Sequence, residues 1–353
     1  MRVWKTVRLS GNHYDLGRQH GEKLSGFIHD SIDLNFKVNG FYTGLTKERM
    51  RRSSRKCLAY LKKNFKHYHR EIEGISEGSG ERIEDVMMLN LHGRDMNGAC
   101  TLFSIPPQFT EDGKVIIGQS VDWTPLLKPF YFIAKLQDKE HDVSIDMFTE
   151  AGIIGLVGKN SAGIGELMSL LLTDRPIREG LPAYLVLRNV LEQKRIGDAL
   201  NAVLNVPRAS PFNYLVSDDS GEIYDVEATP DSYELFYPDD RIYSHTNHVQ
   251  GPSLASSDIY VRASNSCESI HRCNRIGRLL RERARDGPLK VEDAMEAMKD
   301  HANFPDSICR HPLQGISPEG QFETIGAIVL QQGTGGFWIT QGNPCENRFY
   351  HVS

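Results

Sequence analysis

The stretch Asn97-Gly98-Ala99-Cys100-Thr101-Leu102-Phe103-Ser104 decides how this chain folds. Its cysteine follows two very small residues and opens an apolar run of β-forming side chains. A second β-prone run, residues 114–120, comes shortly afterwards and leads into Asp122. Strands that follow one another usually pair. We therefore expect one sheet to hold both the Cys100 thiol and the Asp122 carboxylate.

Length and composition are those of an ordinary soluble protein. The chain has 353 residues, of which 39% are hydrophobic and 25% are charged. No apolar run approaches the roughly 18 residues that a membrane helix needs, and the N-terminal sequence lacks the pattern of a signal peptide. We expect a cytoplasmic protein that does not bind membranes.

The cysteines predict neither a disulfide framework nor a metal site. Six are present, at positions 57, 100, 267, 273, 309 and 345, and none forms a Cys-x-x-Cys pair. His245 and His248 stand three apart, but no third ligand has a recognised spacing from them. We expect reduced thiols, an inert Cys309, and no metal or other cofactor.

Charge is distributed unevenly along the chain. Residues 1–99 carry 18 basic and 12 acidic side chains, whereas residues 100–353 carry 23 and 34. Ten of the basic residues lie between positions 47 and 70. This basic stretch suits either an anionic ligand, such as a coenzyme A thioester or a nucleic acid, or a solvated helix face. We favour the helix face, because the protein is acidic overall and lacks a nucleic-acid motif.

The remaining pattern predicts sheets with helices outside them. Helical stretches are expected near residues 24–34, 47–69, 84–90, 182–193, 196–206, 265–285 and 291–301. Strands are expected at residues 101–105, 114–120, 130–137, 143–148, 152–157, 212–217, 222–227, 232–237, 241–245, 323–330 and 336–341. No repeat or linker divides the chain, so we expect a single folded unit.

Cys100 has a possible role as a nucleophile. A free thiol titrates near pH 8.5 and needs a base to react at neutral pH. A cysteine at a chain's own N-terminus can use its α-amine, with a pKa of roughly 7.7–8.0, as that base. Attack of the Cys100 thiol on the Ala99 carbonyl would create such a terminus, and small residues permit the tight turn required. On this tripeptide alone, a buried core thiol is the simpler interpretation.

Several motifs together resemble the peptidase C45 (acyl-coenzyme A:6-aminopenicillanate acyltransferase-like) family of N-terminal-nucleophile (Ntn) hydrolases. The resemblance covers most of the chain and is carried by residues 11–21, 71–78 (EIEGISEG), 98–101 (GACT), 118–123 (GQSVDW), 245–248 (HTNH) and 307–311 (SICRH). It implies an α+β fold, a four-layer αββα sandwich of two antiparallel sheets. It also implies self-cleavage before Cys100, giving a small subunit of residues 1–99 and a large subunit of residues 100–353 in an αβ heterodimer.

The resemblance implies roles for matching residues. Asp122 would orient the new α-amine, and Asn247 would donate a hydrogen bond to the tetrahedral oxyanion. Arg310 would shape the electrostatics of the nucleophile or meet a substrate carboxylate. We assign Trp123 and His248 to substrate contacts. From sequence alone, Asp122 and Asn247 could equally be turn residues, and Arg310 a surface residue.

We expect an autoprocessed cysteine amidohydrolase or acyltransferase acting on a small-molecule amide or acyl thioester. One alternative is an uncleaved binding protein that holds an anionic ligand at residues 47–70 or at the glycine-rich residues 152–165. Another is a papain-like enzyme with His92 or His248 as the base, which would be active without cleavage.

Overall fold

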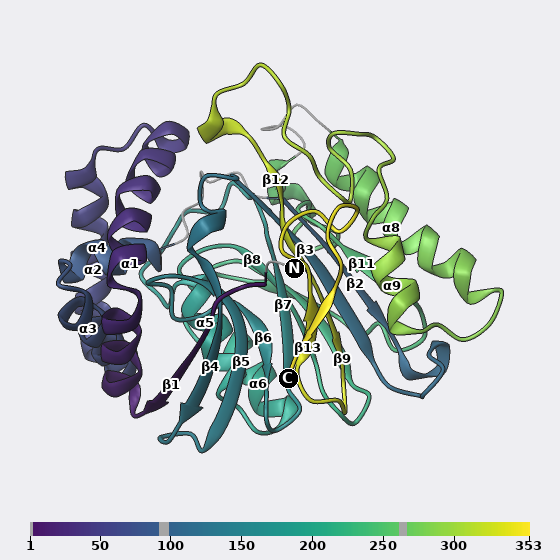
Figure 1. The fold of residues 1–353 in the computed structure, drawn as a ribbon, viewed down its shortest axis with the longest axis horizontal. Helices are drawn as coiled ribbons and strands as arrows, with labels where there is room; N and C mark the ends of the chain where they lie inside the picture. The colour runs from purple at the N-terminus through teal and green to yellow at the C-terminus, as the bar shows by residue number, and fades with distance from the viewer. Residues whose placement is uncertain (1–2, 92–98, 261–266) are drawn as a thin grey trace.

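The computed structural model describes residues 3–91, 99–260 and 267–353. Two sheets pack face to face at its centre (Figure 1). Sheet A has the order β1 (Thr6–Gly11), β4 (Tyr131–Asp138), β5 (Val143–Glu150), β6 (Val157–Asn160), β7 (Gly165–Leu170), β8 (Phe212–Ser217), β9 (Ile223–Ala228) and β10 (Tyr233–Phe236). Its strands are antiparallel except for β1, which lies parallel to β4.

Sheet B is wholly antiparallel and contains the candidate nucleophile. Its order is β11 (Tyr243–His245), β2 (Ala99–Ile105), β3 (Ile116–Trp123), β12 (Glu323–Gln331), β13 (Phe337–Ile339) and β14 (Tyr350–Val352). Every residue of β2, and all but the last of β3, is buried. Both strands are therefore covered on both faces, and their sequences do not alternate between polar and apolar residues; the polar Gln119 and Asp122 of β3 are buried and hydrogen-bonded.

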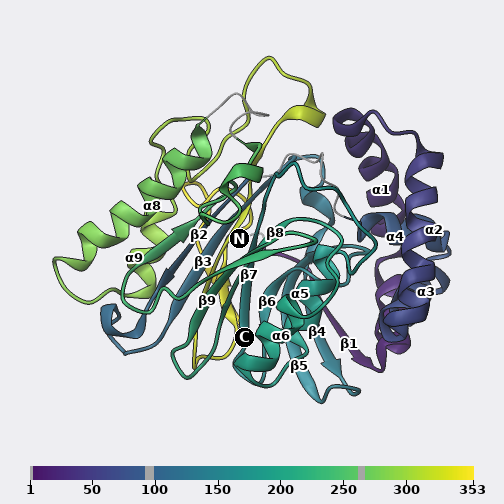
Figure 2. The ribbon, with the colours of Figure 1, turned by 180° about the vertical axis from the view of Figure 1, so that it is seen from behind.

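Helices cover the outer face of each sheet. Helices α5 (Ala183–Leu191) and α6 (Ile196–Leu204) lie against sheet A, as Figure 2 shows from behind. Helices α8 (Glu268–Ala284) and α9 (Val291–Ala297) lie against sheet B. The layers are thus helix, sheet, sheet, helix, which confirms the predicted αββα sandwich of the α+β class.

Four further helices form a block beside the β1 edge of sheet A. They are α1 (His13–Thr43), α2 (Lys47–Asn64), α3 (Lys66–Ser79) and α4 (Ile83–Leu89). Helices α1 and α3 pack so closely that a Cβ atom on Gly17 or Gly74 would overlap backbone atoms of the other helix. Glycine in the two N-terminal motifs is therefore a packing requirement.

Two predicted elements are wrong. The helix expected at residues 47–69 is two helices, because Phe65 has the non-helical dihedral angles φ −139° and ψ 63°. The strand expected at residues 152–157 is a loop up to residue 156, beginning at Gly152 with φ +91°. There Gly155 packs against the Tyr184 carbonyl, so the glycines of this loop serve close packing.

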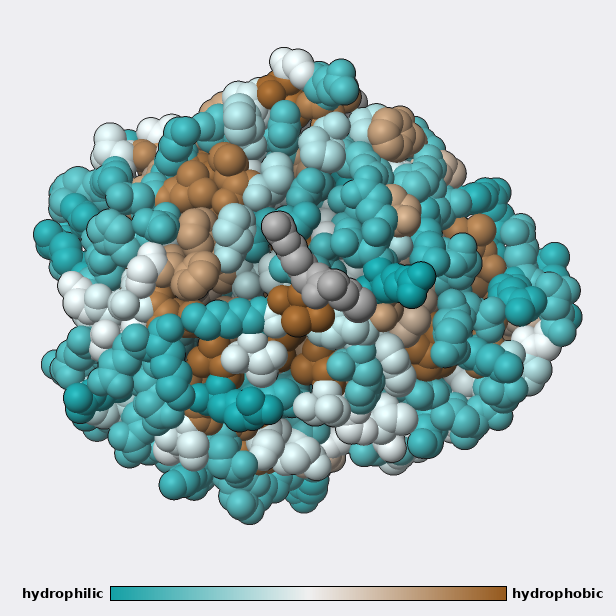
Figure 3. Space-filling model, in the orientation of Figure 1, coloured by the Kyte–Doolittle hydropathy of each residue, from teal (hydrophilic) through white to brown (hydrophobic). Residues whose placement is uncertain are grey.

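The surface of the helical block is polar, and Figure 3 shows mostly hydrophilic side chains at that edge of the molecule. On α2, Arg51 makes two hydrogen bonds of 2.7 and 2.8 Å to Asp85, and Arg55 pairs with Glu48 at 2.6 Å. This agrees with the solvated-helix interpretation of the basic stretch. Within the described ranges, no helix is both long enough and apolar enough to cross a bilayer.

Candidate active site

The pairing of β2 with β3 sets the positions of Cys100 and Asp122. Cys100 lies opposite Val121, and Ala99 lies opposite Asp122. Residues opposite each other share a face of a sheet, whereas neighbours along a strand point to opposite faces. The Cys100 side chain therefore points between the sheets, and the Asp122 side chain points toward α8. The sequence correctly predicted that one sheet holds both residues, and the structure adds that their side chains occupy opposite faces of sheet B.

Asn247 contacts the backbone of the candidate nucleophile directly. Its Oδ1 accepts a hydrogen bond of 3.0 Å from Cys100 N and another of 2.9 Å from Arg272 Nη2. Its Nδ2 donates to the Leu170 carbonyl at 3.1 Å. Two donors at Oδ1 and one acceptor at Nδ2 fix the orientation of the side-chain amide.

Arg272 is a residue of the site that the sequence analysis missed. It is fully buried and projects from α8. Its Nη1 donates to the Cys100 carbonyl oxygen at 2.5 Å and to Thr101 Oγ1 at 2.9 Å, while its Nε bonds Glu268 at 2.6 Å. The i, i+4 spacing of Glu268 and Arg272 is present in the sequence, but this spacing is common on solvent-exposed helix faces and does not by itself indicate a buried pair.

Asp122 accepts two hydroxyl hydrogen bonds, from Thr324 at 2.7 Å and from Ser120 at 3.2 Å. Burial raises the pKa of its carboxyl to about 6, although the positive charges of Arg310 and Arg272 oppose this shift. Arg310 is also buried, and it pairs with Glu268 at 2.8 Å and with Asp306 at 2.6 Å. The structure thus places Asn247 at the Cys100 backbone, and it brings Arg310 near Asp122 and, through Glu268, near Arg272.

Burial, and then the nearby Asp122 carboxylate, raise the pKa of the Cys100 thiol to about 12. In the intact chain the thiol is therefore protonated at neutral pH and needs a base. No histidine is among the described residues that line the cavity beside Cys100. The ring of His248 instead bonds Ser269 Oγ at 2.9 Å, and His92 lies outside the described residues.

The cavity beside Cys100 is narrow and mostly apolar, with a volume of about 30 Å³. Besides Cys100, its walls are Val121, Asp122, Trp123, Tyr131, Leu156, Met168, Leu170, Tyr184 and Phe212. Trp123 is thus at the cavity as expected, whereas His248 is not among its walls. A larger open hollow of about 400 Å³ lies near residues 333–336, but Cys100 is not among the residues that line it.

A second small cavity lies beyond three aromatic walls of the first, Trp123, Tyr131 and Tyr184. Glu150 lines it and accepts hydrogen bonds from Ser31 at 2.6 Å and Asn35 at 2.7 Å. Burial raises the pKa of Glu150 to about 7, against the effect of these two bonds. The site therefore combines an apolar approach to the thiol with a polar group farther away.

The sequence is similar to known proteins over most of its length. The family model "Acyl-coenzyme A:6-aminopenicillanic acid acyl-transferase" matches residues 109–346. The chain is 27% identical over 325 residues to the 40 kDa form of acyl-coenzyme A:6-aminopenicillanic-acid-acyltransferase from Emericella nidulans, covering 88% of this chain and 86% of that protein.

Similar solved structures include penicillin V acylase from Agrobacterium tumefaciens, with 12% identity, a TM-score of 0.45, and coverage of 69% of this chain and 83% of that one. A variant of conjugated bile acid hydrolase from Clostridium perfringens has 13% identity, a TM-score of 0.45, and coverage of 72% and 96%. Because the family model spans more than half of the sequence, the chain belongs to the acyl-coenzyme A:6-aminopenicillanic acid acyl-transferase family.

Proposed function

We propose that this acyl-transfer enzyme is activated by cleavage between Ala99 and Cys100 and then uses Cys100 as an N-terminal nucleophile. The observation that carries the proposal is the placement of Cys100 itself. Its side chain points into the cavity between the sheets, while its backbone nitrogen bonds Asn247 on the side where the charged groups gather. A nitrogen held in this way is suited to act as the base once it becomes an amine.

Cleavage requires two steps. The Cys100 thiol attacks the Ala99 carbonyl carbon, the C–N bond breaks, and the nitrogen takes up the proton as the acyl group moves to sulfur. Water then hydrolyses the thioester, which leaves a carboxylate on Ala99 and a free thiol and amine on Cys100. Since Ala99 is paired with Asp122, its departure opens space beside the Asp122 carboxylate, next to the new amine.

In turnover the α-amine takes the thiol proton, and the thiolate attacks the carbonyl carbon of a linear amide or acyl thioester. Asn247 Nδ2 has one acceptor among the described residues, the Leu170 carbonyl, so its second hydrogen is available to the developing oxyanion. The ammonium group then protonates the leaving amine or thiol. Water, or an acceptor amine, finally removes the acyl group from sulfur.

Two arginines support this chemistry. Arg272 holds the Cys100 carbonyl and Asn247 in one arrangement, and Arg310 places positive charge near Asp122. With Asp122 ionised, its carboxylate orients the α-amine and stabilises the protonated form that follows proton transfer. The apolar and aromatic walls of the cavity suit an apolar acyl group, with Trp123 as one contact.

The test is the intact mass of freshly purified protein under denaturing conditions. We expect two fragments, residues 1–99 and 100–353, and a single uncleaved chain for Cys100→Ala. Cys267→Ser, a change at an exposed thiol, is the matched control and should cleave normally. An acyl probe that reacts with thiols should label Cys100 of the large fragment.

Two other results would contradict the proposal. A wild-type chain that stays whole yet turns over substrate would favour an enzyme of the papain type. A whole chain that binds an anionic ligand, with Cys100 left unlabelled by the probe, would favour a non-catalytic binding protein of the same fold.

A further inference from the structure

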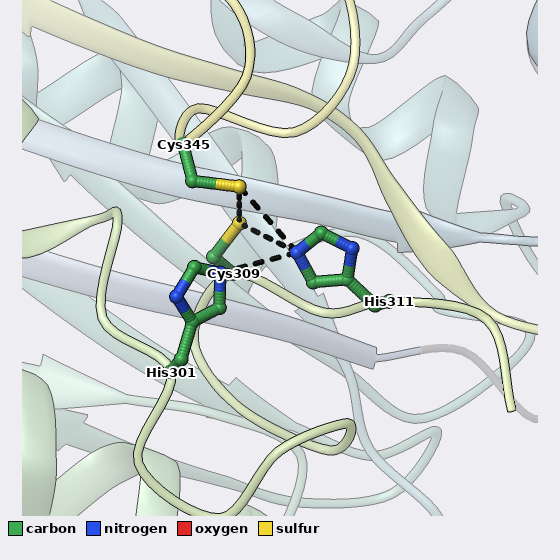
Figure 4. A group of neighbouring side chains, drawn as sticks. All are labelled: His301, Cys309, His311 and Cys345. Carbon is green, nitrogen blue, oxygen red and sulfur yellow. Dashed lines mark hydrogen bonds between the residues drawn. The ribbon is translucent and has the colours of Figure 1, made fainter.

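Four side chains that the proposed function does not use converge at the end of sheet B near α9. They are His301, Cys309, His311 and Cys345, and Figure 4 shows their sulfur and nitrogen atoms pointing toward one another. Two loops supply them: the segment after α9 carries His301, Cys309 and His311, and the segment between β13 and β14 carries Cys345. Cys309 is fully buried, His311 is half-buried, and His301 and Cys345 are exposed.

The donor atoms lie within 4.8 Å of one another, and four of their separations are close to those of a tetrahedral zinc site. Zinc bonds of about 2.3 Å to sulfur and about 2.05 Å to nitrogen place two sulfurs about 3.8 Å apart, sulfur and nitrogen about 3.6 Å apart, and two nitrogens about 3.3 Å apart. Here Cys309 Sγ and Cys345 Sγ are 3.4 Å apart, and His311 Nε2 lies 3.7 and 3.4 Å from them. The Nε2 atoms of His301 and His311 are 3.1 Å apart.

The lone pairs of these groups are also able to converge on a cation. When His301 and His311 are both neutral, two facing Nε2 atoms can share at most one hydrogen, so one lone pair must accept from the other ring. A metal at the centre accepts a lone pair from each of the four donors at once. Asn343 Nδ2 lies 3.6 Å from Cys309 Sγ and donates to the Arg310 carbonyl at 2.6 Å, as expected of a group that orients a ligand.

We propose that these four side chains bind one Zn²⁺ ion in a structural Cys₂His₂ site. Two thiols release their protons to solvent and bind as thiolates, whose charge balances that of the ion, while the histidines bind as neutral rings through Nε2. Four protein ligands complete the tetrahedron, so no position remains for a substrate or a reactive water. Thiolate and imidazole donors favour zinc over magnesium or calcium.

The ion would hold the backbone that carries Arg310. Arg310 lies between two of the ligands, and its N–H donates to Thr324 Oγ1 at 2.9 Å while its carbonyl accepts from Thr324 N at 3.0 Å. The Thr324 hydroxyl in turn donates to Asp122. The zinc site therefore connects the loop that carries Cys345 to the charged groups around Cys100. Arg310 is held in position because its neighbours in sequence, Cys309 and His311, are both zinc ligands.

A second group of side chains with metal-ligating atoms is already balanced by a cation of the protein. His13, Asp138, His141 and Glu192 also converge, but the guanidinium of Arg188 lies 3.7 Å from Asp138 and 2.7 Å from Glu192. Glu71 adds a further pairing with Arg188 at 3.2 Å. The guanidinium of Arg188 therefore already balances these carboxylates.

The spacing of residues in the sequence did not reveal the Cys₂His₂ group, because its members are spread over 45 positions, from His301 to Cys345.

The experiment is elemental analysis of the full chain, made with zinc in the growth medium and purified without a chelator or a metal-binding tag. We expect one zinc per chain in the wild type and in Cys100→Ala, whose metal content does not depend on cleavage or activity. Cys345→Ser and His311→Ala should lose the zinc, and Cys267→Ser should keep it. Replacement of zinc by Co²⁺ in the wild type should produce a thiolate-to-cobalt charge-transfer band, a readout that requires no variant.

Two results would overturn the proposal. One is a wild-type chain that lacks zinc and is two hydrogens lighter than expected, with a Cys309–Cys345 disulfide found by peptide mapping. The other is equal zinc content in the wild type and in Cys345→Ser, together with no cobalt–thiolate band, which would mean adventitious metal only.

Discussion

Asp122 is a carboxyl group whose burial opposes its own ionisation. Burial raises its pKa from 3.8 to about 6, even with two arginines nearby. A shift of about two units corresponds to about 3 kcal/mol. The folded state therefore binds the Asp122 proton more tightly than the unfolded state does. This destabilising contribution is absent below about pH 4, grows from about pH 4 to pH 6, and stays constant at higher pH.

We predict that Asp122→Asn stabilises the uncleaved Cys100→Ala chain at neutral pH. The Cys100→Ala chain is not cleaved, so it has no α-amine at position 100 that would favour the ionised form of Asp122. The substitution by asparagine therefore removes the free-energy cost of ionising a buried carboxyl group. The gain in unfolding free energy should be up to about 3 kcal/mol above pH 6 and should shrink toward pH 4. Urea unfolding curves measured between pH 4 and pH 8 check this.

The same substitution should abolish turnover in the chain that retains Cys100, because the α-amine loses its carboxylate. Asp112→Asn, at an exposed turn, is the matched control and should change neither the stability nor the activity. A loss of stability in Asp122→Asn that is equal at all pH values would contradict the argument.

At the scale of elements, α8 brings charge to the backbone of β2. One face of this helix carries Arg272, which donates to the Cys100 carbonyl, and Glu268, which pairs with Arg272. Another face carries Arg275, which pairs with Asp300 at 2.5 Å near the surface. The buried pair is coupled to the site, whereas the outer pair only links α8 to the loop after α9. Two arginines on one helix therefore have separable roles.

We predict that Arg272→Lys slows both self-cleavage and turnover, by roughly 10²-fold. Lysine keeps the positive charge but cannot reach Glu268, the Cys100 carbonyl and Asn247 together, because it lacks the planar fork of arginine. Arg275→Lys on the same helix should leave both rates within a factor of about two. The measurements are the time course of fragment appearance and the initial rate of substrate hydrolysis. Equal effects of the two substitutions would show that only helix stability is involved.

Most elements could be predicted from the sequence, because long periodic or β-prone runs fix their type. The hairpin of β8 and β9, the helices α5 and α6, and the pairing of β2 with β3 all follow the predicted runs. The break at Phe65 could not be predicted, since the apolar and basic pattern continues through it. The parallel pairing of β1 with β4 depends on contacts between residues more than 120 positions apart.

The site could be predicted in part. The motifs placed Cys100, Asp122, Asn247 and Arg310, and the structure brings them together, although their catalytic roles stay predictions. Arg272 was missed because burial, rather than residue type or spacing, distinguishes it from the other arginines of α8. The aromatic walls of the cavity were missed for a similar reason, since Tyr131 and Tyr184 come from strands and helices far apart in sequence.

At the scale of the whole molecule, the proposed small subunit is built into the core of the large one. Strand β1 pairs with β4 along its whole length, and Trp4 Nε1 donates to the Thr340 carbonyl at 2.9 Å. Buried polar links also cross the boundary, such as Glu71 with Arg188 at 3.2 Å and Tyr68 with Glu192 at 2.7 Å. The opposite net charges of the two segments are therefore a minor part of what would keep them together.

We predict that the two fragments of the cleaved protein stay together in about 1 M salt and separate only in denaturant. Salt at this concentration screens exposed charges over about 3 Å but leaves buried pairs and the β1–β4 hydrogen bonds intact. Gel filtration at low and high salt should give one peak that contains both fragments and elutes with uncleaved Cys100→Ala. Release of residues 1–99 by salt alone would mean that surface charge holds the subunits together. It would also contradict a helical block anchored through β1, because six consecutive residue pairs of that strand with β4 would have to separate first.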